Sequence, residues 1–189
     1  RFSTVVRWVQ FDESTQKFTV TVEDLASGIT ESNEFDRVII GSGHFSFPNV
    51  PDFDGIETFP GTLIHAHDFR GAERLAGRNV LLIGASYSAE DIGIQAFKMG
   101  ASSVTMSYRT APMGYEWPEG IQERPLVTRF EGNTAHFADG TEGQFDAVIL
   151  CTGYLHHYPF LPSDLALSSP NNLYPKSLYR GVVSEANNQ

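Results

Sequence analysis

The sequence holds a single cysteine, Cys151, and this scarcity excludes an intrachain disulfide. It has no CxxC pair, so the usual redox-dithiol chemistry has no residues here. No apolar run approaches the roughly 20 residues that a membrane-spanning helix needs, and no signal peptide is visible. These absences favour a cytoplasmic protein.

Basic residues are also scarce. Lysine and arginine number 13 against 23 acidic residues, which gives a formal net charge of −10. This balance argues against nucleic acid and anionic membranes as partners. It does not exclude a nucleotide cofactor, because local backbone amides and one arginine can outweigh a global charge. The first residues lack a methionine and start directly in strand-like alternation, so we expect a piece of a longer protein.

The first third of the chain is rich in β-forming residues. Residues 3–11 and 17–24 read as a hairpin with long arms, separated by a polar turn. Residues 35–40 are a short apolar run that predicts a strand ending in the Gly-Ser-Gly turn at 41–43. Residues 47–61 contain three prolines and are loop-like.

From residue 79 the pattern changes to an α/β unit, with apolar positions at helical spacing after a buried strand. Glycine at position 100 is the expected end of that helix. The elements predicted are a strand at 79–83, a helix at 88–99, a strand at 102–109, a loop at 110–125, a hairpin across 138–140 and a strand at 145–150.

The connection between that first strand and the helix has the spacing Gly84-x-Ser86-x-x-Ala89. This is the dinucleotide fingerprint with serine and alanine at its second and third glycine positions. Gly84 would allow the tight turn, and Ser86 and Ser88 could each donate a hydroxyl to a phosphate at the positive helix N-terminus. Taken alone, the turn fits an ordinary α/β connection equally well.

The end of the following strand indicates which nucleotide would bind. An NAD site carries an acidic residue there for the ribose hydroxyls, whereas this strand ends in Arg109 and Thr110. Arginine can form a charge-assisted fork with a 2′-phosphate, which a carboxylate would repel. The position therefore favours NADP(H) over NAD(H); the alternative is that Arg109 is a solvated surface residue.

Three stretches together resemble the flavin-containing monooxygenases. Phe59, Gly61, His65 and Phe69 match the family's identifying pattern F-x-G-x-x-x-H-x-x-x-[FY]. The stretch "GASYSAED" is similar to the family's internal NADP-binding turn, and "LCTGY" is similar to its "ATGY" motif. Within the family, "HAHDFR" and "YRTAPMGYEWPE" look most like the bacterial trimethylamine monooxygenase branch.

The resemblance implies an α/β fold in which a Rossmann-like, three-layer NADP-binding domain is inserted into an FAD-binding domain. The implied divisions are residues 1–70 as part of the FAD-binding domain, 71–160 as the NADP-binding domain and 161–189 as a return segment. The family's FAD turn, G-x-G-x-x-G, does not occur before residue 79, and the C-terminal part is also missing. We therefore expect the isolated chain to lack tight flavin binding and turnover.

The resemblance also implies the chemistry. In the family, reduced FAD reacts with O2 to give a C4a-hydroperoxide, which oxygenates an amine nitrogen or a sulfide sulfur while NADP⁺ shields it from water. It implies no general base or nucleophile among the residues of this chain. The NADP-binding residues implied are Gly84, Ala85, Ser86, Tyr87, Ser88, Arg109 and Thr110, with Thr152 and Gly153 beside the dinucleotide crossover. On the FAD side, Val6 would touch the adenine, and Ser42 and His44 would face the flavin nucleotide.

Other interpretations are open at this stage. His65 and His67 could share the face of a strand beside Asp68 as a metal site, although no third ligand is evident and the family pattern already accounts for His65. Trp117 could line a cofactor channel or cap a loop. The chain could also be a stand-alone NADP-binding module, an inactive remnant, or part of a disulfide-reductase-type enzyme. Bare strand edges would favour a homodimer.

Overall fold

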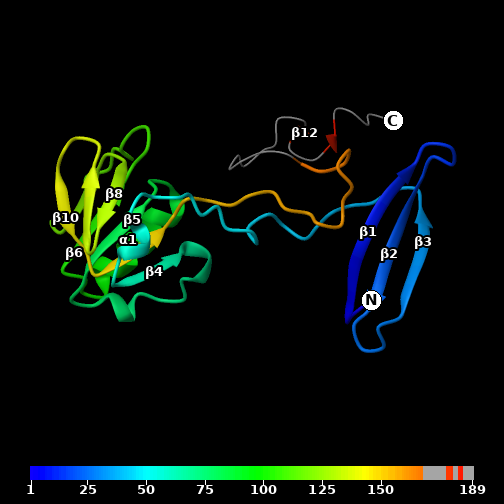
Figure 1. Ribbon diagram of the computed structural model, residues 1–189, viewed down its shortest axis with the longest axis horizontal. Helices are drawn as coiled ribbons and strands as arrows, with labels where there is room; N and C mark the ends of the chain where they lie inside the picture. The colour runs from blue at the N-terminus through cyan, green and yellow to red at the C-terminus, as the bar shows by residue number, and fades with distance from the viewer. Residues whose placement is uncertain (168–177, 181–182, 185–189) are drawn as a thin grey trace. The chain divides into compact units, whose positions relative to one another are not determined.

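The computed structural model describes residues 1–167, 178–180 and 183–184. The chain divides into two compact units, one formed by Pro48–Gly153 and the other by Arg1–Phe47 with Tyr154–Gln189 (Figure 1). Much of the expected return segment, 161–189, lies outside the described residues. Among the helices that the structure describes, none is long and apolar enough to cross a bilayer.

The unit Pro48–Gly153 is built on a five-stranded sheet in which all neighbouring strands are parallel. Its strand order is β4 (Thr62–His65), β11 (Ala147–Leu150), β5 (Asn79–Ile83), β6 (Ser103–Ser107) and β7 (Ile121–Arg124). Strand β4 precedes the expected domain start at residue 71, yet it pairs with β11 in this sheet. The assignment of the units to NADP and FAD stays a prediction.

The two faces of the sheet are covered by different layers. Val80 and Leu82 face the cluster that includes helix α1 (Tyr87–Lys98), and Leu81 and Ile83 face the opposite cluster. An antiparallel meander covers that second face through β8 (Val127–Glu131), β9 (Thr134–Phe137) and β10 (Glu142–Gln144). Because strands buried on both faces need a layer on each side, the near-continuous apolar runs predict this arrangement. The three-layer α/β fold is thus confirmed.

Helix α1 packs closely on the sheet because a small residue faces it. A Cβ added at Gly93 would lie 2.3 Å from the terminal methyl of Met106 on β6. The helix ends before Gly100, whose φ of 86° is a conformation that other residues rarely adopt. The predicted strand at 79–83, the helix at 88–99 and the hairpin across 138–140 are confirmed within one or two residues.

The prediction of a loop over 110–125 is wrong at its C-terminal end. Residues Ile121–Arg124 form β7, the edge strand beside β6, and Ile121 is buried against α1's side of the sheet. Prolines and glycines on both sides concealed a four-residue strand that forms by parallel pairing with β6. Three short 3₁₀ helices complete this unit: η1 (Ile56–Thr58), η2 (Ala66–Asp68) and η3 (Glu73–Leu75).

The other unit contains an antiparallel sheet of β1 (Thr4–Asp12), β2 (Lys17–Asp24) and β3 (Thr30–Phe35). The β1–β2 pairing confirms the predicted hairpin. The expected strand at 35–40 is wrong: residues 36–40 are not in a strand, and Ile39 is 93% exposed. An apolar run forms a strand only where another strand offers hydrogen bonds, and β3 takes the edge of β2 instead. A two-stranded ladder of β12 (Leu178–Tyr179) and β13 (Val183–Ser184) also belongs to this unit.

Candidate functional site

The glycine turn lies at the carboxyl end of β5. Gly84 has a φ of 123°, and a Cβ there would lie 2.3 Å from the carbonyl oxygen of Cys151. Gly84 N–H donates to the Ser107 carbonyl at 2.9 Å, and Cys151 N–H donates to the Ile83 carbonyl at 2.8 Å. Only glycine fits this position, because both the backbone conformation and the close neighbour exclude a side chain.

The turn leads directly into the N-terminus of α1. Ser86 is the N-cap residue in extended conformation, and its hydroxyl makes no capping hydrogen bond. The amides of residues 85–88 have no hydrogen-bond acceptor within the described part of the chain. The side chains of Ser86, Tyr87 and Ser88 are exposed. Unpaired amides and hydroxyls at the positive end of a helix can bind an anion such as a phosphate.

The structure brings Arg109 and Thr110 to the same edge of the sheet. They follow β6, whose last residue, Ser107, pairs with Ile83 at the end of β5. Both side chains are exposed and make no hydrogen bond or ion pair within the described ranges. A guanidinium beside a phosphate-binding turn can contact a 2′-phosphate, so the NADP prediction keeps its geometric basis.

Thr152 and Gly153 follow β11 at this edge too, but their polar groups have structural partners. Thr152 Oγ1 donates to the Asn49 carbonyl at 2.5 Å, and Asn49 Nδ2 donates back to the Thr152 carbonyl at 3.0 Å. Asn49 N–H also donates to the Gly153 carbonyl at 2.9 Å. These bonds fix the loop after β11 to the segment before β4.

His65 also holds the loop after β11, through the end of β4. It is 6% exposed at the end of β4, and its Nδ1 accepts a hydrogen bond from His67 N–H at 3.0 Å. The proton must therefore be on Nε2, which donates to the Gly153 carbonyl at 3.0 Å. Burial lowers the pKa of His65, and the hydrogen bond to Gly153 only partly opposes this shift. The imidazole thus acts as a neutral link between β4 and the loop after β11.

The idea that His65 and His67 share a strand face is wrong, because His67 lies in η2, beyond the end of β4. His67 Nδ1 is 2.8 Å from Asp68 Oδ1. The described residues contain no group of three side chains that could hold a metal ion.

The rest of the family pattern serves packing around β4. Phe59 is buried with its ring centroid 6.0 Å from that of Phe130, and Phe69 packs against the cluster on the α1 side. A Cβ at Gly61 would lie 2.4 Å from the Asp146 carbonyl oxygen. The identifying pattern thus describes how β4 joins the sheet, a role that the sequence alone did not reveal.

Val6, Ser42 and His44 belong to the other unit, so they are not part of this edge of the sheet. Val6 lies at a bulge in β1 and is 39% exposed. His44 stacks on His156 with centroids 5.1 Å apart. Their expected contacts with FAD stay a prediction.

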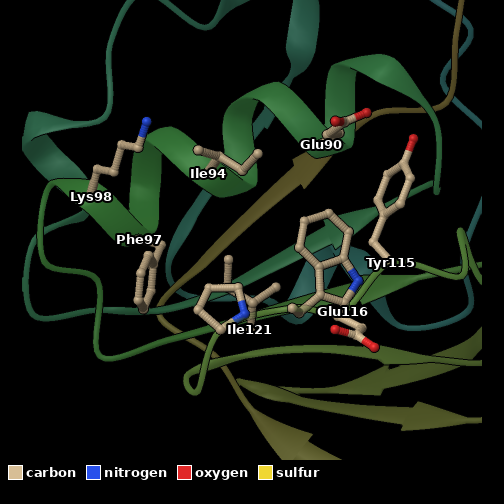
Figure 2. A pocket seen from close by; sticks show the side chains of 9 residues that line it. Glu90, Ile94, Phe97, Lys98, Tyr115, Glu116 and Ile121 are labelled. Carbon is tan, nitrogen blue, oxygen red and sulfur yellow. The ribbon is translucent and has the colours of Figure 1, made fainter.

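A groove of about 390 Å³ runs along α1 and is lined mainly by apolar side chains (Figure 2). Figure 2 shows Ile94 and Phe97 of the helix on one side and Tyr115 and Ile121 on the other. None of the predicted nucleotide-binding residues lines it. Trp117 does line it, and its Nε1–H donates to Glu123 Oε2 at 3.0 Å, so this tryptophan also fixes its own loop.

Comparison with known proteins identifies the class. Residues 1–115 match the family model described as flavin-binding monooxygenase-like, and the chain belongs to this family. This confirms the predicted family, and the family is one of flavin-binding oxidoreductases.

The chain is 57% identical to the trimethylamine monooxygenase of Methylocella silvestris over 99% of its length, and 54% identical to that of Roseovarius nubinhibens over 97%. Among solved structures, it is similar to Tmm from Pelagibacter sp. strain HTCC7211, with a TM-score of 0.87 and 46% identity over 97% of this chain and 41% of that one. The chain spans 42% and 41% of the two curated relatives.

Proposed function

We propose that this chain is the NADP-binding portion of an NADPH- and FAD-dependent monooxygenase that oxygenates a soft nucleophile, in particular a tertiary amine such as trimethylamine. The observation that carries the proposal is the Gly84 turn, with unpaired amides at the start of α1 and Arg109 at the same edge of the sheet. The names of the most similar relatives support the amine as substrate.

The residues of the turn fit a dinucleotide phosphate. The amides of residues 85–88 and the hydroxyls of Ser86 and Ser88 offer donors to the pyrophosphate, and the helix N-terminus adds positive potential. Arg109 and Thr110 would contact the 2′-phosphate, with no carboxylate at the end of β6 to repel it. Tyr87, 82% exposed at the start of α1, would lie near the pyrophosphate or the nicotinamide half.

FAD, when bound, supplies the activation of O2 and the transfer of one oxygen atom to the substrate. The work of this chain is to bind and orient NADP(H), whose bound form would help to keep water from the reaction. Thr152 and Gly153 would contribute a fixed loop beside the crossover. Residues 1–70 and 161–189 are proposed as parts of the FAD-binding domain, with Val6, Ser42 and His44 toward FAD.

The experiment is calorimetric titration of the chain with NADPH and, in parallel, NADH. We expect tighter binding of NADPH, and Arg109→Ala should weaken NADPH by roughly 1.5–3 kcal/mol through loss of a charge-assisted fork, with little change for NADH. Arg74→Ala, an exposed arginine in η3, removes the same charge elsewhere and is the matched control. Equal affinity for both nucleotides, or an unchanged affinity in Arg109→Ala, would contradict the proposal.

An NADP-binding module without oxygenase activity would give the same titration. The two functions differ when FAD, NADPH and trimethylamine are supplied together. When this assay is run on the whole protein of which this chain is proposed to be the NADP-binding portion, amine-dependent consumption of O2 supports a monooxygenase. NADPH binding without O2 consumption in that protein would favour the module.

A further inference from the structure

The loop between β6 and β7 carries two of the proposed NADP contacts. It starts after Ser107, passes through Arg109 and Thr110, and reaches Trp117 before β7 begins at Ile121. A parallel crossover is usually made by a helix, whose own hydrogen bonds fix its shape. This crossover contains no helix, so its position depends on anchors from the rest of the unit.

One side chain provides the polar anchor of this loop. Glu123 of β7 accepts a hydrogen bond from Met113 N–H at 2.7 Å through Oε1, and another from Trp117 Nε1–H at 3.0 Å through Oε2. Within the described part of the chain, these are the only side-chain hydrogen bonds that residues 109–119 make. Both oxygens of one half-buried carboxylate thus hold the middle of the loop.

The anchor lies in register with the end of β6. Glu123 pairs with Met106, and the Tyr108 amide donates to the Arg124 carbonyl at 2.9 Å. Residues 109–112 are therefore held at one end by the β6–β7 ladder and at the other by the bond from Met113 to Glu123. Packing of Met113 and Trp117 against the α1-side cluster supports the same placement.

We propose that Glu123 is a positioning residue for recognition of the 2′-phosphate, acting through the loop that carries Arg109 and Thr110. The inference rests on the proposed binding of NADP(H) at this edge. A fork between a guanidinium and a phosphate depends on geometry, so release of the loop weakens it. NADH has no 2′-phosphate, so loss of the Glu123 bonds should lower the affinity for NADPH more than the affinity for NADH. Glu123 thus affects nucleotide preference without contacting the nucleotide.

The test compares Glu123→Gln with Glu119→Gln, which makes the same charge change at an exposed position of the same loop. A glutamine at position 123 keeps one acceptor for Met113 but turns an amide donor toward the Trp117 ring nitrogen. We expect the Kd for NADPH to rise about tenfold, the loss typical of a charge-assisted hydrogen bond, with NADH changed less than about twofold. Glu119→Gln should match the wild type with both nucleotides.

A second variant separates positioning from folding. Trp117→Phe removes the ring N–H together with the rest of the five-membered ring, and keeps the bond from Met113 to Glu123, so it should weaken NADPH binding by a smaller factor, about threefold. In a Trp8→Phe background, where Trp117 is the remaining tryptophan, Glu123→Gln should change the Trp117 emission before nucleotide is added. Protection of the buried Cys151 thiol from labelling shows whether the variant is folded.

The outcomes are distinct. An unchanged NADPH-to-NADH preference in both variants, or an equal loss for the two nucleotides, overturns the role of Glu123 while the proposed function stands. If the wild-type chain shows no preference for NADPH, the proposed NADP site fails, and the inference is overturned with it. A selective loss for NADPH in Glu123→Gln, smaller in Trp117→Phe, supports it.

Discussion

The two sheets of this chain differ in what covers them. In the parallel sheet of Pro48–Gly153, Val80, Leu81 and Leu82 are fully buried, because helix α1 covers one face and the meander covers the other. In the described part of the other unit, Val9 is the one buried hydrophobic residue, and β3 is exposed along its whole length.

The difference shows that strands can pair into a sheet without being buried by a covering layer. β1 and β2 pair over eight residue pairs, so local pattern and turn suffice to form the hairpin. Yet Trp8 and Phe35 remain 40% and 47% exposed, so burial adds little to the stability of this sheet. The parallel sheet gains from burial on both faces, and the Gly84 turn is built on that sheet.

The largest loss of stability is expected from a substitution at the centre of the parallel sheet. Leu81→Ala removes a fully buried side chain and should lower the free energy of unfolding of the unit Pro48–Gly153 by about 3 kcal/mol. Unfolding in urea can be followed by labelling of Cys151, because burial raises the pKa of this thiol to about 12 and keeps it unreactive until the unit opens.

Leu25→Ala in the other unit is the matched control, because that leucine is 60% exposed. Leu25→Ala should change the free energy of unfolding of its own unit by less than about 0.5 kcal/mol. A similar loss in both variants would contradict the contrast between a covered and an uncovered sheet.

An intermediate effect concerns His65 and pH. Burial lowers the pKa of His65 below its ordinary value of 6.5, so the folded unit favours the neutral imidazole. As pH falls below 6.5, the unfolded chain binds a proton that the folded unit does not, and the free energy of unfolding falls by at most about 1.4 kcal/mol per pH unit. Above pH 6.5 the stability that the neutral His65 imidazole contributes is fully present.

His65→Gln should remove this part of the acid sensitivity, measured as urea midpoints between about pH 5 and 7 with Cys151 labelling as the probe. His67→Gln, in the neighbouring 3₁₀ helix, is the control and should leave most of the slope in place. If the slope survives in His65→Gln but disappears in His67→Gln, the assignment to His65 is incorrect.

The smallest effect is expected on the uncovered sheet. Arg7 Nε lies 2.8 Å from Glu23 Oε2 across β1 and β2, with both side chains partly exposed. Such a pair is worth about 0–1 kcal/mol and is screened by salt. Arg7→Ala should therefore cause a small loss, measured as hydrogen exchange of the β2 amides at low salt and at about 1 M salt. A loss above about 2 kcal/mol, or one that does not depend on salt, would count against this description.

Sequence reasoning succeeded where the signal is local. The glycine turn, the helix ending before Gly100 and the hairpin of β1 and β2 follow from spacing and turn chemistry within a few residues. The residues predicted to bind NADP, at the turn and at the end of β6, lie at one edge of the sheet, as parallel strands require; their binding of NADP stays a prediction.

Reasoning from sequence failed where partners lie far apart. Strand β7 exists because β6 is beside it, and residues 36–40 are not in a strand because β3 occupies the edge of β2. The role of His65 depends on the Gly153 carbonyl, 88 residues away. No local pattern reports such a contact.

By itself, the sequence determined the α/β class, the glycine turn and the place of the arginine on which the NADP prediction rests, because backbone freedom, helical spacing and charge are properties of short stretches. Only the tertiary structure decided which strands pair, that His65 is a neutral link and that Glu123 holds the loop of Arg109. The physical reason is that a hydrogen bond in the interior depends on which distant groups packing brings together, and packing involves the whole unit at once.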